Sequence, residues 1–76
     1  MTKKTLDALY IHAHVIGYYA TENPEKFSQD MKDIYKLVEQ MYLFNMITYK
    51  KWQEIHKKIG EHMRAGLDEY REQHAA

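Results

Sequence analysis

Histidines are the residues of this chain best suited to chemistry, because imidazole binds metals and transfers protons near neutral pH. Five occur, at His12, His14, His56, His62 and His74. Two histidines on one helix share a metal when they are three or four residues apart, so that both side chains project from the same face. His12 and His14 are two residues apart, and His56 and His62 are six apart. We therefore predict no metal site and no cofactor.

Nucleophiles and phosphate-binding loops are also missing. The chain contains no cysteine, its only serine is Ser28, and neither Gly-x-Ser-x-Gly nor a glycine-rich phosphate loop occurs. Neighbouring carboxylates such as Asp30 and Asp33 lie among lysines, which is typical of solvated helix faces with i,i+4 ion pairs. We therefore expect a protein that is not an enzyme.

Composition indicates one small helical domain. Three glycines and one proline are too few for the hairpins of a β-sandwich or barrel. Eleven basic residues balance eleven acidic ones, so bulk attraction to nucleic acid or membrane is not expected. No secretory apolar region and no run of about 20 apolar residues occurs, which favours a cytoplasmic protein without membrane association. We predict a single all-α domain over residues 1–76, either a three-helix bundle or a helical hairpin plus an N-terminal helix. A homodimer is expected, since so short a monomer buries little surface.

Apolar spacing and capping signals predict three helices, at about residues 5–21, 24–44 and 48–72. Asn23 and Pro24 are typical of an N-cap and the first helical position. Thr48 is a candidate N-cap for the third helix, and Ile47 before it is placed to pack on Trp52 as a hydrophobic staple. Because no glycine or proline separates the second helix from the third, one continuous rod is the alternative.

Two further features concern packing. The helix over residues 24–44 is apolar most of the way round near its end, which predicts that it is the central helix. Gly17 lies beside the apolar stripe of the first helix. Glycine inside a helix costs about 1 kcal/mol relative to alanine, so we expect a neighbouring backbone to approach closely there.

Positive charge is concentrated between positions 47 and 64, with five basic residues against two acidic ones. The basic residues are Lys50, Lys51, Lys57, Lys58 and Arg64. Tyr49 in the same segment adds an aromatic ring of the kind that nucleic-acid-binding surfaces use, whereas Glu54 and Glu61 would repel phosphate. The first two lysines fall in the first turn of the third helix, where a cation opposes the helix dipole by about 0.3–1 kcal/mol. Either an anionic partner compensates, or the helix begins elsewhere. A DNA-binding regulator that uses this basic face is one alternative function.

Aromatic residues are unusually abundant, with seven tyrosines, two phenylalanines and one tryptophan. Tyrosine is enriched in protein interfaces because it combines a large apolar area with a polar end. Tyr35, Tyr42 and Tyr49 recur at intervals of seven, and Tyr10 and Tyr18 lie on the first helix. We predict that these five residues bind a partner, either a second copy of the chain or another protein. The competing interpretation is a core whose hydroxyl groups reach its rim.

Residues 37–59 resemble a helix–Ile-Thr–helix hairpin that occurs in many short bacterial modules. The segment has Met-Ile-Thr at positions 46–48, with Asn45 where glycine is common and Lys51 where a capping glutamate would stand. In size and in its use of lysine, isoleucine and tyrosine, the chain is similar to small early or regulatory proteins of phages and mobile elements of low-GC Gram-positive bacteria. The resemblance implies a regulatory protein that binds a host or element protein and blocks or recruits it. A structural subunit of a larger assembly is a further alternative.

Overall fold

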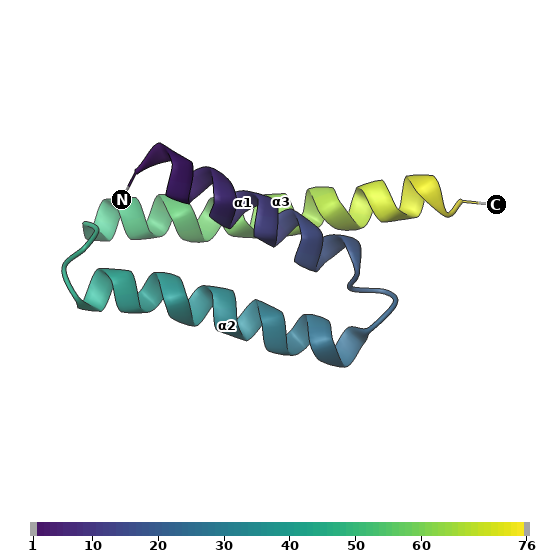
Figure 1. Cartoon of the computed structure of the whole chain (residues 1–76), viewed down its shortest axis with the longest axis horizontal. Helices are drawn as coiled ribbons and strands as arrows, with labels where there is room; N and C mark the ends of the chain where they lie inside the picture. The colour runs from purple at the N-terminus through teal and green to yellow at the C-terminus, as the bar shows by residue number, and fades with distance from the viewer. Residues whose placement is uncertain (1, 76) are drawn as a thin grey trace.

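Three α-helices make up the fold in a computed structural model that describes residues 2–75. Helix α1 spans Lys3–Tyr18, α2 spans Pro24–Leu43 and α3 spans Tyr49–Gln73. Figure 1 shows that α1 and α3 run in the same direction and that α2 runs antiparallel to both. The predicted all-α fold is confirmed. Among residues 2–75, no helix combines the length and the apolar character that crossing a bilayer requires.

A side-chain cap begins each helix. Thr2, Asn23 and Thr48 each accept a hydrogen bond from the backbone N–H three residues later, at 3.1–3.2 Å. The predicted caps Asn23 and Thr48 are confirmed, and Thr2 starts α1 two residues earlier than predicted. Helix α1 also ends earlier, at Tyr18, because the Ala20 N–H bonds to the carbonyl three residues before it and tightens the chain into a turn.

The turn after α2 separates it from α3. Asn45 has a φ of 60°, in the left-handed region that asparagine tolerates better than most residues. The Met46 N–H donates to the Met41 carbonyl at 2.8 Å and the Asn45 N–H donates to the Tyr42 carbonyl at 3.0 Å. This pair of hydrogen bonds is the Schellman arrangement, which closes a helix at its C-terminus. The predicted break is confirmed, and the continuous rod is excluded.

Helices α1 and α3 approach each other most closely. A Cβ added at Gly17 would lie 2.8 Å from the Met63 Cα and would overlap the carbonyl of that residue. A Cβ added at Gly66 would lie 2.8 Å from the Tyr18 nitrogen and would overlap the His14 carbonyl. Only glycine fits at either position, because backbone atoms occupy the space of a side chain. The predicted close approach at Gly17 is confirmed.

The core lies mainly between α1 and α3, so the prediction that the helix over residues 24–44 is central is wrong. The buried apolar side chains are Leu9, Ala13 and Ile16 of α1, Ile34 and Val38 of α2, and Ile55, Ile59 and Met63 of α3. Helix α2 thus contributes only two of them, along one line. The prediction was based on the wide apolar surface near the end of this helix. In the structure Leu37 and Leu43 on that surface are exposed rather than packed between neighbouring helices.

Candidate protein-interaction surfaces

An exposed apolar patch covers the turn between α2 and α3. Leu43, Phe44, Met46 and Tyr49 are 63%, 75%, 62% and 55% exposed. We call these four residues the hairpin tip, which lies at the same end of the molecule as the N-terminus (Figure 1). Clustered exposed apolar side chains are typical of protein–protein interaction sites. Of the tip residues, only Tyr49 was predicted from the sequence to bind a partner.

Three of the predicted partner-binding tyrosines lie in one aromatic row along α2 and α3. Tyr35 packs on His56 with ring centroids 4.4 Å apart, and His56 lies 5.3 Å from Trp52. Tyr49 stacks on Trp52 at 5.7 Å and lies 5.7 Å from Tyr42. Tyr35 and Trp52 also pack against the core. The row therefore serves internal packing along most of its length and reaches the surface at Tyr49.

The other two tyrosines lie between α1 and α3. The Tyr10 ring stacks on His62 at 4.9 Å with an interplanar angle of 14°. The Tyr18 hydroxyl donates a 2.5 Å hydrogen bond to Gln73 Oε1. The structure thus divides the five predicted residues between two seams. The tyrosine–histidine stacks could not be predicted from the sequence, because each histidine is far along the chain from its tyrosine.

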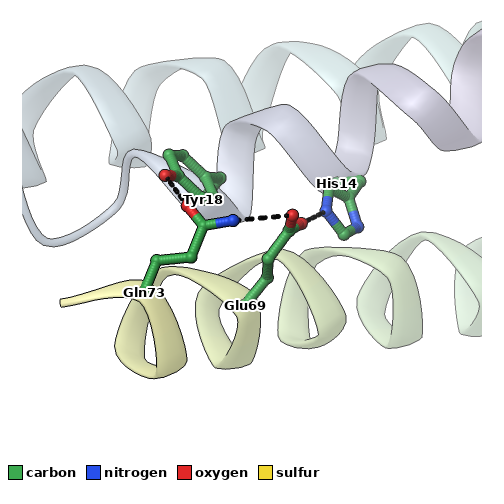
Figure 2. A network of polar contacts seen from close by, with 4 residues as sticks. All are labelled: His14, Tyr18, Glu69 and Gln73. Atoms are coloured by element: carbon green, nitrogen blue, oxygen red, sulfur yellow. Dashed lines mark hydrogen bonds and ion pairs between the residues drawn. The ribbon is translucent and has the colours of Figure 1, made fainter. Parts of the chain in front are cut away.

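A polar network joins the ends of α1 and α3 (Figure 2). His14 Nε2 contacts the carboxylate of Glu69, and Gln73 Nε2 donates to the other oxygen of that carboxylate at 3.3 Å. The side-chain amide oxygen of Gln73 accepts from the Tyr18 hydroxyl, so α1 contributes the two ends of the network, His14 and Tyr18, and α3 contributes its middle. The network fixes the relative positions of the two helices at this end of the molecule.

The basic face of α3 is balanced by carboxylates of the same helix. Four of the five residues predicted to bind nucleic acid form ion pairs: Lys51 and Lys58 with Glu54 at 3.6 and 3.4 Å, Lys57 with Glu61 at 3.9 Å, and Arg64 with Asp68 at 3.3 Å. Lys51 first, and then the hydrogen bond from Lys58, lower the pKa of Glu54. The helix does begin at Tyr49, so Glu54 is the anion that compensates Lys51 in the first turn. For Lys50, no ion pair forms within residues 2–75.

Metal ligands do not gather in the fold: among residues 2–75, no group of three or more histidine, cysteine or acidic side chains is placed to hold a metal ion. The architecture defines a three-helix protein whose distinctive surface features are apolar patches. Comparison with protein-family models finds no match, and no curated protein or solved structure matches the chain significantly.

Two half-buried tyrosines make the free energy of unfolding depend on pH in the alkaline range. Burial raises the pKa of Tyr10 and of Tyr35 above the ordinary value of 10.0, and for Tyr10 nearby Glu54 and Asp7 add to the effect while Lys58 opposes it. Above pH 10.0 the folded chain therefore holds more protons than the unfolded chain, so the free energy of unfolding falls as pH rises. Below that pH this contribution is fully present.

We accordingly expect the melting temperature to fall above pH 10.0, and to fall less in a Tyr10→Phe/Tyr35→Phe double variant. Thermal unfolding followed by circular dichroism across this range measures both slopes. Tyr49→Phe is the matched control, because Tyr49 is 55% exposed. Equal slopes for the wild-type chain and the double variant would contradict the expectation.

Proposed function

We propose that this protein is a small non-enzymatic regulator that acts by protein–protein contact, binding a host or element protein and blocking or recruiting it. The hairpin tip carries the proposal. Its exposed side chains belong to an uncharged stretch, residues 40–49, whereas the exposed faces of α2 and α3 carry ion pairs. Phenylalanine, methionine and tyrosine supply large, adaptable contact area, and such residues dominate binding energy when a partner buries them.

Local hydrogen bonds hold the backbone of the hairpin tip in one conformation. The Schellman turn fixes the backbone at Asn45, and the Thr48 cap fixes the start of α3. A rigid turn holds Phe44 and Met46 out before a partner arrives, so little conformational entropy is lost on binding. In the proposed mechanism, the tip occupies an apolar site on the target protein. Its presence there either blocks the binding of another protein or recruits one.

A tagged chain incubated with lysate of the encoding organism tests the proposal, with bound proteins identified by mass spectrometry. We expect one stoichiometric protein that survives nuclease and high salt, and that is lost with Leu43→Ser/Phe44→Ser/Met46→Ser. The matched control, Lys57→Ser/Glu61→Ser, removes an exposed ion pair elsewhere on the surface and should retain the protein. Equal capture by the tip variant and the wild-type chain would reject the tip as the site.

The same experiment decides between this proposal and DNA binding. Phosphate contacts lose affinity steeply between about 50 and 200 mM salt, whereas an apolar interface changes little. The ion pairs along α3 support the apolar interface, since carboxylates beside Lys51, Lys57 and Lys58 weaken attraction for phosphate. Capture that collapses under nuclease, and that is lost on Lys50→Ala, would instead favour the DNA-binding regulator.

A further inference from the structure

The outward face of α1 is a second apolar surface, at a distance along the chain from the hairpin tip. Ile11, Val15 and Tyr19 are 66%, 45% and 52% exposed, and Ala8 on the same side is also exposed. We call these four residues the α1 ridge. No Asp, Glu, Lys or Arg occurs between Asp7 and Glu22. A surface helix normally carries charged residues opposite its core-facing stripe, so an uncharged outer face indicates a helix that is covered on both sides.

Grooves flank the α1 ridge on both sides. An open groove of about 690 Å³ lies between α1 and α3; Ile11 and Val15 border it on α1, and polar side chains including Lys58 and Glu61 border it on α3. A second groove, of about 300 Å³, lies between α1 and α2 and is bordered by Val15 and Tyr19. Helices pack by fitting the ridge of one into the groove of another. A ridge beside its own grooves supplies both parts of a ridge-into-groove contact with a second copy, as a two-fold interface requires.

The molecule as a whole exposes more surface than a compact monomer of its mass. The elongated body, 46 × 23 × 17 Å, exposes 5585 Å². A compact monomer of 9.2 kDa exposes about 4,900 Å². The excess over the whole body, about 650 Å², is of the same order as the roughly 800 Å² that each partner buries in a standard protein–protein interface.

Charge at the two ends of α1 favours an antiparallel pair. Lys3 and Lys4 outnumber Asp7 at the N-terminal end, and Glu22 follows the C-terminal end. When Ile11 lies opposite Val15 of the second copy, Lys3 and Lys4 of one copy lie at the C-terminal end of the other copy's α1, which Glu22 follows. A parallel pair would instead place the lysines of both copies together. Antiparallel packing also aligns the helix dipoles favourably.

We propose that the protein forms a two-fold homodimer in which the α1 ridges of two copies pack antiparallel. This inference is independent of the proposed function, because it uses α1 and leaves the hairpin tip free. The tip lies at the N-terminal end of α1 (Figure 1). An antiparallel dimer therefore carries its two tips at opposite ends, where each can engage a separate target site.

Analytical ultracentrifugation of the full chain between about 1 and 100 μM tests the dimer. We expect a mass of twice 9.2 kDa at the upper concentrations. Val15→Glu places a carboxylate in the interface and should raise the dimer dissociation constant by about tenfold or more, with unchanged helicity. Leu37→Glu on α2 is the matched control, because Leu37 is 46% exposed, like Val15, and should leave the constant unchanged.

Cysteine crosslinking tests the register without relying on the folding of Val15→Glu. The chain has no cysteine, so single substitutions report one position each. An equimolar mixture of Lys4→Cys and Glu22→Cys chains should form a mixed disulfide dimer under mild oxidation, faster than either chain crosslinks with itself. A monomer mass at every concentration, a dimer that Val15→Glu leaves intact, or preferential self-crosslinking of Lys4→Cys would each overturn the proposal.

Discussion

Alanine at Gly17 or at Gly66 is expected to lower the free energy of unfolding by about 3 kcal/mol or more. Each new methyl group would meet backbone of the facing helix, since a Cβ at either position lies 2.8 Å or less from main-chain atoms of Met63 or Tyr18. Backbone cannot rotate out of the way as a flexible side chain can, so α1 and α3 must move apart. That movement loosens the tightest helix pair in the fold.

Gly60→Ala is the control for this prediction. A Cβ at Gly60 would meet only the Tyr35 hydroxyl oxygen, at 3.5 Å, which is an ordinary contact. Because alanine favours the helix over glycine by up to about 1 kcal/mol, this variant should be as stable as the wild-type chain or more stable. Urea unfolding followed by circular dichroism measures all three variants. If Gly17→Ala were as stable as Gly60→Ala, the close approach of α1 and α3 would be wrong.

Replacing Ile59 with alanine is expected to cost about 3–4 kcal/mol of unfolding free energy. Ile59 is fully buried near the middle of α3, in the core to which all three helices contribute. Truncation to alanine removes three buried carbon atoms and leaves a cavity in a small core. A domain of 76 residues is typically stable by about 4–11 kcal/mol, so this one change removes a large share of the total.

Two further variants serve as comparisons for Ile59→Ala. Leu37→Ala removes a comparable side chain that is 46% exposed, and should cost less than about 1 kcal/mol. Ile34→Ala removes a buried isoleucine from α2, and should cost less than Ile59→Ala because α2 packs along one line only. Urea denaturation ranks the three. A larger loss at Ile34 than at Ile59 would return α2 to the centre of the core.

Local chemistry made the helices predictable. Asn23 with Pro24, and Thr48 before an amphipathic segment, each satisfy backbone N–H groups at a helix start through their own atoms or through a missing donor. These interactions span three or four residues, so they can be inferred from neighbouring letters. The end of α1 was harder to place, because no glycine or proline marks it and a turn hydrogen bond at Ala20 decides it.

The candidate surfaces were only partly predictable. The tyrosines were recognised as surplus aromatic residues, but residue type does not reveal whether a ring faces solvent or a neighbour. Tyr10 stacks on His62 and Tyr35 on His56, pairings that depend on how the helices are placed side by side. The tip residues Phe44 and Met46 emerged as a surface only because the Schellman turn exposes them.

The amino-acid sequence by itself determined the all-α class, the three helices and the caps Asn23 and Thr48 of the second and third helices. Each of these follows from periodicity or from interactions between near neighbours in the chain. Only the tertiary structure decided that the core lies mainly between α1 and α3 and that Gly17 and Gly66 meet backbone of the facing helix. Contacts between residues some fifty positions apart depend on how α1 and α3 cross. The spacing of side chains along a single helix does not determine that crossing.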